Sequence, residues 1–234
     1  MNRIFITGDK HGEMSLMTHL SSKNWKDGPC LSRDDYLIIA GDFGVLWKFI
    51  PDKTEKYLMG WLKNKPWTTL FVDGNHENFQ RINALPIVDF KGGKAGMVTD
   101  YIYHLRRGEV YTIGNRTIFT FGGANSIDKK YRKEGLSWWP EELCNYAETN
   151  YALDNLSKVN YKVDCVISHT PPQAIMKMIG INDNICPNAK FLDHVASNVQ
   201  YGAFFSGHVH EDKRISKFFL VYEKVLDLEE CLKS

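Results

Sequence analysis

The stretch Gly74-Asn75-His76-Glu77 follows the apolar run Thr69-Leu70-Phe71-Val72. An apolar run that gives way to Gly-Asn-His is typical of a strand that delivers polar side chains to the end of a sheet. Four other apolar runs end in Asp or His in the same way, within residues 4–12, 36–42, 165–169 and 203–210. Packing alone does not explain five such endings, and together they predict one shared polar site.

The order of the expected elements predicts an α/β fold. Strands at 3–8, 36–40 and 68–73 alternate with helices at 13–20, 52–63 and 77–85, which is typical of parallel βαβ units. A β-meander is expected at 98–104, 109–113 and 117–121, followed by a helix from 140 to 156. Strands at 163–168 and 203–206 should enclose a helix near 191–197, and a hairpin should form within 215–228. Because no linker or repeat interrupts the pattern, we expect residues 1–234 to form a single domain.

The composition narrows the classes of protein that the chain can represent. Lys and Arg number 29 against 28 for Asp and Glu, so the overall charge does not favour a protein built mainly to hold nucleic acid, although a local basic patch could still serve one. No apolar run approaches the roughly 20 residues that cross a bilayer, and the start of the chain lacks a signal-peptide pattern. Five widely spaced Cys without a C-x-x-C motif indicate reduced thiols. We therefore expect a cytoplasmic protein with no membrane partner.

The polar strand ends carry the residue types that bind divalent metals. Asp and His are good ligands for first-row ions, and Asn supplies a neutral oxygen. Two-metal hydrolysis of a phosphate ester needs about seven ligands, including a bridging carboxylate, and a general acid for the leaving oxygen. The sequence meets this count with Asp9, His11, Asp42, Asn75, His76, His169, His208 and His210.

In this order the motifs resemble those of the calcineurin-like metallophosphoesterases: D-x-H at 9–11, G-D at 41–42, G-N-H-E at 74–77, a lone His at 169 and G-H-x-H at 207–210. The resemblance spans residues 8–210 and implies a four-layer α/β/β/α sandwich, with two mixed sheets packed face to face. The meander would supply the second sheet. The chain is more similar to small bacterial or phage-type members than to protein Ser/Thr phosphatases, because residues 41–47 lack the second carboxylate and the Arg of the motif G-D-x-x-D-R-G.

The resemblance also implies a role for each motif residue. One ion would be held by Asp9, His11, Asp42 and His210, and a second ion by Asp42, Asn75, His169 and His208. Asp42 would bridge the two ions, a hydroxide between them would attack phosphorus, and His76 would protonate the leaving group. Mn²⁺ is the expected metal, with Fe²⁺ or Zn²⁺ as alternatives.

The segment 122–142 is the candidate for substrate contacts, and it resembles a segment of the small bacterial members. It carries Asn125, Lys129 and Arg132 beside Trp138 and Trp139. Cations can hold phosphate and aromatic rings can stack on a base. The alternative is an ordered surface loop whose tryptophans anchor it to the core.

Three functions stay open at this stage. The leading one is hydrolysis of phosphate esters. The second is a phosphodiesterase or nuclease acting on nucleotides or nucleic acid, and the third is an inactive metal-binding scaffold on the same fold. Of the remaining polar residues, Glu77 could either support the metal ligands or be an acid of a helix first turn, and the second interpretation is favoured. Lys10 is expected to be solvated. No role is assigned to His19, His104 or His194, and the oligomeric state is left open.

Overall fold

The computed structural model describes residues 2–181 and 186–233, which form two mixed β-sheets. The first sheet has the order β13 (Leu226–Asp227), β1 (Ile4–Thr7), β2 (Tyr36–Ile39), β3 (Thr68–Phe71), β6 (Ile102–Leu105), β5 (Gly93–Thr99) and β4 (Ile87–Phe90). The second has the order β11 (Lys213–Ile215), β12 (Phe218–Leu220), β10 (Ala203–Ser206), β9 (Cys165–Ser168), β8 (Arg116–Phe121) and β7 (Val110–Ile113). The central strands of each sheet are parallel and the outer strands are antiparallel.

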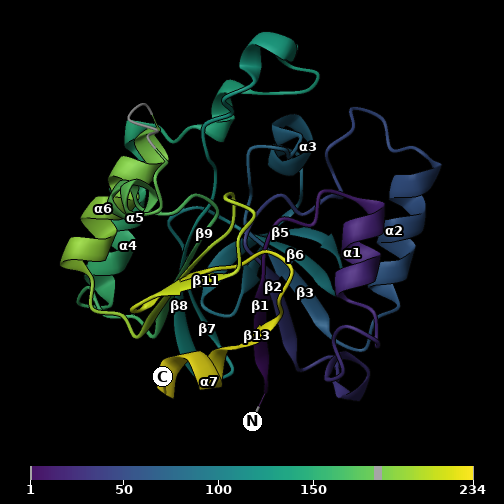
Figure 1. Ribbon diagram of the computed structural model, residues 1–234, viewed down its shortest axis with the longest axis horizontal. Coiled ribbons are helices and arrows are strands. Elements are labelled where there is room, and N and C mark those ends of the chain that lie inside the picture. The colour runs from purple at the N-terminus through teal and green to yellow at the C-terminus, as the bar shows by residue number, and fades with distance from the viewer. Residues whose placement is uncertain (1, 182–185, 234) are drawn as a thin grey trace.

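Helices cover the outer face of each sheet (Figure 1). On the side of the first sheet lie α1 (Glu13–His19) and α2 (Lys53–Lys63), and on the side of the second lie α4 (Tyr146–Lys158), α5 (Gln173–Met178) and α6 (Pro187–Asn198). The short helices α3 (Phe79–Asn83) and α7 (Leu228–Lys233) follow β3 and β13. The expected four-layer sandwich is therefore confirmed. Among the described residues, none of the helices combines the length and the apolar composition that crossing a bilayer requires.

The layers follow from the two-residue period of the strands. Ile4 and Ile6 pack toward the second sheet and meet Ile118 and Phe205 in a core between the sheets. Phe5, which lies between them in the sequence, packs outward in a second core with α1 and α2. A third core lies between the second sheet and the helices α4 and α6. Because neighbouring residues face opposite sides, strands that are apolar throughout can be buried on both faces.

The predicted meander was wrong in two respects. Residues 98–104 do not form one strand: β5 ends at Thr99, β6 begins at Ile102, and the register shifts between Met97 and Thr99. Both strands also belong to the first sheet, where β6 runs parallel to β3, and only β7 and β8 contribute to the second. Alternating apolar residues show that a strand has a buried face, but they do not specify which strand it pairs with.

The later elements also differ from the predictions. The helix expected at 140–156 is divided into a 3-10 turn at Pro140–Glu142 and α4, whose start is fixed by a capping box between Asn145 and Glu148. The expected terminal hairpin corresponds to β11 and β12, while β13 returns to the first sheet and pairs with β1. The short helices α5 and α7 were not predicted.

Candidate metal centre

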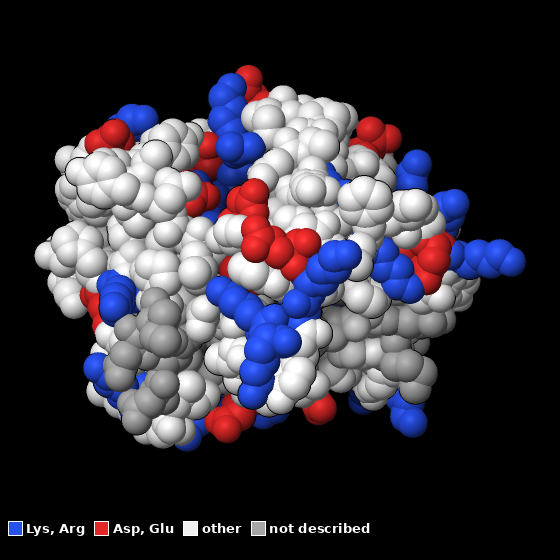
Figure 2. Space-filling model, turned by 90° about the horizontal axis from the view of Figure 1, so that it is seen from above, with Lys and Arg blue, Asp and Glu red and all other residues white. Residues whose placement is uncertain are grey.

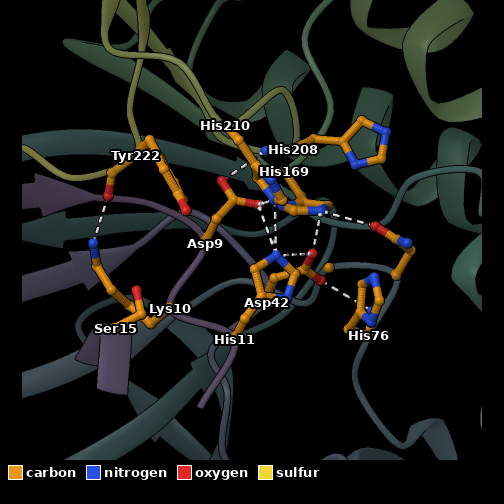
Figure 3. Close-up of polar contacts among 12 residues, drawn as sticks. Asp9, Lys10, His11, Ser15, Asp42, His76, His169, His208, His210 and Tyr222 are labelled. Atoms are coloured by element: carbon orange, nitrogen blue, oxygen red, sulfur yellow. Dashed lines mark hydrogen bonds and ion pairs between the residues drawn. The ribbon is translucent and has the colours of Figure 1, made fainter. Parts of the chain in front are cut away.

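The chain brings the polar strand ends together at one edge of the sandwich. Asp9, Asp42 and Asn75 follow the parallel strands β1, β2 and β3 of the first sheet, while His169 and His208 follow β9 and β10 of the second. The carboxyl ends of parallel strands meet at the same edge, which is where open α/β sheets bind ligands. Since the two sheets pack face to face, their carboxyl edges form one site (Figure 3).

One group of side chains has the geometry of a metal site. The ligand atoms of Asp9, His11, Asp42 and His210 all lie within 4.8 Å of one another. The Nε2 atom of His11 lies 3.3 Å from Oδ2 of Asp42 and 2.8 Å from Nε2 of His210. The Nε2 atom of His210 lies 3.5 Å from Oδ1 of Asp9. This is the set that the sequence assigned to the first ion.

Asp9 tests whether these residues suit a cation. Its Oδ2 atom accepts a hydrogen bond from the backbone N–H of His208, at 2.8 Å. Its Oδ1 atom is buried and has no hydrogen-bond partner among the described residues. A buried carboxylate oxygen without a partner is costly, and a divalent ion removes that cost. Carboxylate oxygen beside imidazole nitrogen is also the donor set that first-row divalent metals prefer, so the residues fit the expected metal.

A second group meets the first at Asp42. The Oδ2 atom of Asp42 lies 3.4 Å from Nε2 of His169, which in turn lies 3.1 Å from Oδ1 of Asn75. The Nδ1 atom of His169 donates to the carbonyl of Ala40 at 2.8 Å, which fixes the ring and directs Nε2 toward the oxygens of Asp42 and Asn75. The same carboxylate oxygen of Asp42 therefore faces an imidazole of each group. Burial would raise the pKa of Asp42, but the surrounding imidazoles hold it well below its usual range.

His208 lies at the margin of the second group. Its ring centroid is 5.0 Å from that of His169, and the rings are inclined by 68°. In Figure 3 its ring takes part in none of the polar contacts that are drawn. Burial lowers the pKa of His208 to about 3, so its imidazole is neutral, which is the form that binds a metal. The structure thus places His208 beside His169, but it does not bring the ring against Asp42.

The backbone around the site is strained. A left-handed conformation, with positive φ, is found at Asp9 (41°), His11 (33°), Asp42 (47°), His208 (68°) and His210 (52°). Each such non-glycine residue costs on the order of 1–3 kcal/mol, and such strain gathers at functional sites. The close packing also requires glycine at position 74, where a Cβ atom would lie 2.1 Å from Oδ1 of Asp42.

Glu77 supports the loops of the site, and the prediction of a helix first-turn acid was wrong. Its side chain is buried and accepts hydrogen bonds from the backbone N–H groups of Phe43, at 2.6 Å, and Gly74. The helix α3 begins only at Phe79 and is capped by Asn78. Burial, together with the charge of Asp42, raises the pKa of Glu77 to about 8. Glu77 thus joins the loop after β2 to the loop after β3.

Two further polar residues have partners next to the site, and the prediction that Lys10 is solvated was wrong. Lys10 is fully buried instead of solvated, with its Nζ atom 3.0 Å from Nδ1 of His19 and donating to the carbonyl of Tyr222. His104, to which no role was assigned, has its Nε2 atom 3.0 Å from Oδ1 of Asp73. Lys10 and His104 are therefore each held by a residue that is remote in sequence, Tyr222 and Asp73 respectively.

His76 lies between the metal groups and the segment 122–142. Its backbone N–H donates to Oδ1 of Asp42 at 3.0 Å, and its ring centroid is 4.9 Å from that of His11. The Nη2 atom of Arg132 lies 2.8 Å from Nε2 of His76, while Nε of Arg132 donates to Asp128. Burial lowers the pKa of His76. The expected acid therefore lies beside the candidate metal ligands and one expected substrate contact.

The segment 122–142 holds Asn75 through two residues that sequence reasoning missed. The Nδ2 atom of Asn75 donates to Oγ of Ser126 at 2.9 Å, and Oγ of Ser126 donates to Oε2 of Glu142 at 2.7 Å. Glu142 is fully buried, whereas the neighbouring Glu141 is exposed. This chain of hydrogen bonds turns the carbonyl oxygen of Asn75 toward His169.

The three expected substrate contacts differ in their surroundings. Asn125 and Arg132 line a cavity of about 410 Å³ together with Asp42, Asn75 and His76. Lys129 instead forms an ion pair with Glu142, at 2.7 Å, and donates to Asn125. Trp139 is buried, as expected of a residue that anchors the segment to the core. The segment is thus both anchored and adjacent to the candidate site.

This fold and this site are consistent with the class of metal-dependent phosphoesterases. The chain matches the family model described as Calcineurin-like phosphoesterase over residues 2–212, and it belongs to that family. It is also 29% identical, over 190 residues, to the lariat debranching enzyme of Schizosaccharomyces pombe, a match that covers 74% of this chain and 37% of the relative. The chain therefore corresponds to well under half the length of that relative.

Proposed function

We propose that this protein hydrolyses phosphate esters with two divalent cations bound at the edge of the sandwich. The first would be held by Asp9, His11, Asp42 and His210, and the second by Asp42, Asn75, His169 and His208. When bound, the ions would act as Lewis acids and lower the pKa of a water molecule at the site. The observation that carries the proposal is that one oxygen of Asp42 faces an imidazole of each group. Mn²⁺ is the ion that we propose, with Fe²⁺ and Zn²⁺ as alternatives.

The protein's own residues would orient the ester and supply the proton. Arg132 and Asn125 line the cavity beside Asp42, where a guanidinium and an amide can bind phosphate oxygens. His76 would protonate the leaving oxygen, and its hydrogen bond to Asp42 fixes the backbone that carries its ring. Burial lowers the pKa of His76, an effect that the charge of Asp42 opposes and the charge of Arg132 reinforces.

A phosphodiester is the second candidate substrate. It is favoured by the similarity to a lariat debranching enzyme and by the basic side chains above the site. Figure 2 shows Lys and Arg side chains gathered at the centre of this face, over the segment 122–142. Lys130 and Lys133 of this segment are exposed and so available to a polyanion. The cytoplasmic location expected from the sequence stays a prediction.

The test is a panel of phosphate monoesters and diesters, measured with Mn²⁺, Fe²⁺ or Zn²⁺ on the wild type and on His76→Asn. We expect turnover with at least one metal and a fall in kcat of about 10²- to 10⁴-fold in the variant, the usual contribution of a general acid, with the metal content unchanged. His194→Asn, a change on the exposed face of α6, is the matched control and should leave kcat unchanged.

Two results would contradict these assignments. An unchanged kcat in His76→Asn would remove the role of general acid from that residue. A wild-type protein that turns over no ester with any of the metals would favour the inactive scaffold instead. The ratio of monoester to diester turnover separates the two candidate substrates.

A further inference from the structure

A second and smaller cavity adjoins the candidate metal centre and shares His76 with the larger cavity of the site. It has a volume of about 180 Å³ and is lined by His11, Gly44, Trp47 and His76. His76 also lines the larger cavity that contains Asp42 and Arg132. Sites for drug-sized ligands start at about 300 Å³, so the smaller cavity suits a single ring better than a whole nucleotide.

Trp47 is a large apolar residue of this cavity whose side chain is not buried in a core. Its side chain is 46% exposed, whereas the preceding Val45 and Leu46 are buried. The loop between β2 and α2 that carries Trp47 rises above the same edge of the sandwich as the segment 122–142 (Figure 1). An exposed indole at the rim of a polar site is an available surface for another flat ring.

The backbone on both sides of Trp47 is fixed. The carbonyl of Leu46 accepts a hydrogen bond from the backbone N–H of Asn78 at 3.0 Å, and that of Lys48 accepts one from Nη1 of Arg81 at 2.9 Å. Phe43, earlier in the loop, is buried and stacks on Phe71 with ring centroids 4.3 Å apart. The indole is therefore presented from a preorganised loop, which reduces the entropy lost when a ligand binds against it.

We propose that Trp47 forms the stacking wall of a leaving-group subsite that takes a flat aromatic ring. The inference rests on the proposed function, in which His76 protonates the leaving oxygen. The leaving group must then lie within reach of His76, and the smaller cavity is the space between His76 and Trp47. The phosphate occupies the larger cavity beside Asp42 and Arg132. Substrates with an aryl or nucleobase ring on the leaving side are preferred over simple alkyl esters.

The test compares Trp47→Ala and Trp47→Phe with the wild type on phenyl phosphate, ethyl phosphate and adenosine 5′-monophosphate. Each substrate is compared across the variants, so that differences in leaving-group reactivity cancel. Trp47→Ala should raise KM for phenyl phosphate about tenfold, as loss of one aromatic stack does, and change ethyl phosphate less than about twofold. Trp47→Phe keeps an aromatic face and should retain most of the affinity. The adenosine ester shows whether a nucleobase, set farther from the phosphorus, also reaches Trp47.

Phe49→Ala is the matched control. Phe49 lies in the same loop and is 56% exposed, but it lines neither cavity, so its removal should leave all three substrates unchanged. A second readout needs no turnover: Trp47→Ala should weaken inhibition by phenylphosphonate and leave inhibition by methylphosphonate unchanged. Thermal denaturation of each variant confirms that it is folded.

The outcomes separate this inference from the proposed function. If the wild type is active but Trp47→Ala affects aryl and alkyl ligands equally, or if Phe49→Ala has the same effect, the subsite is wrong and the metal chemistry stands. If no ester is turned over by the wild type, both are overturned. If Trp47→Ala weakens binding of the adenosine ester alone, Trp47 stacks on a ring, and that ring is the nucleobase. An effect on phenyl phosphate and phenylphosphonate supports a ring bound directly to the leaving oxygen.

Discussion

The guanidinium of Arg132 lies against the imidazole of His76, with Nη2 of Arg132 2.8 Å from Nε2 of His76. His76 follows the central strand β3, whereas Arg132 belongs to the segment after β8. Asp128 accepts a hydrogen bond from Nε of Arg132 and so holds the guanidinium in the wall of the cavity that Arg132 and His76 line. The contact therefore positions one cation next to the group that would donate a proton.

Replacement of Arg132 should impair binding of the ester. Arg132→Ala removes charge-assisted hydrogen bonds worth about 1.5–3 kcal/mol, so KM for phenyl phosphate should rise by about 10- to 100-fold. Arg132→Lys keeps the positive charge but loses the planar guanidinium, so its KM should lie between those of the wild type and Arg132→Ala. Lys133→Ala, on the exposed neighbouring position, serves as control. Steady-state kinetics check the prediction, and a KM that does not change in Arg132→Ala would contradict it.

Ser126 should matter for the second cation although it is not a ligand. Ser126→Ala removes the oxygen that holds Nδ2 of Asn75, so the amide is no longer kept with its carbonyl toward His169. Changes of this kind cost about 10- to 100-fold in metal affinity. Calorimetric titration with Mn²⁺ should show one weakened site and one site close to that of the wild type. Ser137→Ala, in an exposed part of the same segment, is the control and should bind Mn²⁺ like the wild type. If Ser126→Ala also binds Mn²⁺ like the wild type, Ser126 does not support the second site.

Metal binding should stabilise the fold, and Asp9 should carry much of the effect. At a free Mn²⁺ concentration about 100 times Kd, a single site adds about 2.7 kcal/mol to the free energy of unfolding. Asp9→Asn should lose most of this gain. In a chelator the variant should be at least as stable as the wild type, because the buried Oδ1 atom of Asp9, which has no hydrogen-bond partner among the described residues, then belongs to a neutral amide instead of a charged carboxylate. Urea unfolding with Mn²⁺ and with a chelator measures the free energy of unfolding of each protein in both conditions.

The control for this experiment is Asp89→Asn, whose carboxylate is 87% exposed and pairs only with Lys94 among the described residues. It should keep the full response to Mn²⁺. If Asp9→Asn responds to Mn²⁺ as strongly as the wild type, the cation binds elsewhere.

Asp164 should give the stability of the second sheet a pH dependence. Burial opposes ionisation, but hydrogen bonds from the backbone and hydroxyl of Thr117, at 2.7 and 2.8 Å, and the ion pair with Arg116 lower the pKa of Asp164. The unfolded chain then binds more protons than the folded one, so this contribution is complete above an unfolded pKa of about 4 and is lost as the pH falls below it.

Asp164→Asn should therefore cost about 1 kcal/mol of unfolding free energy at pH 7, a low value because the side chain is 30% exposed. The difference from the wild type should shrink as the pH falls below about 4. Asp34→Asn, at an exposed position, is the control. Denaturant unfolding over this pH range measures the difference; a constant difference across it would show that ionisation of Asp164 is not responsible.

The sequence was sufficient for the parts of the site that lie next to a strand end. Asp42 and Asn75 could be predicted because their positions relative to β2 and β3 are local, and parallel strands deliver such residues to one edge. Ser126 and Glu142 could not, since their contact with Asn75 depends on how a long segment folds back over the site. Nothing in the pair Glu141-Glu142 indicates that the second of the two carboxylates is fully buried.

The same distinction applies to the fold. The strands of the first half were predicted because each is apolar and bounded by turns, and their order follows from the βαβ connections. The pairing of β6 with β3, and of β13 with β1, joins strands that are not neighbours in the chain. Nothing in the alternation of residues 98–104 or 215–228 specifies such a partner.

The connection between β12 and β13 carries the chain from the second sheet to the first, and it passes the candidate metal centre on the way. The ring of Tyr222 in this connection stacks on His210 with centroids 4.9 Å apart, and its carbonyl accepts hydrogen bonds from Lys10 and Thr7. The crossover that joins the two halves of the sandwich thus packs on His210, a candidate ligand of the first ion. Loading that ion should raise the cooperativity of unfolding, so that both sheets melt in one transition and neither persists alone.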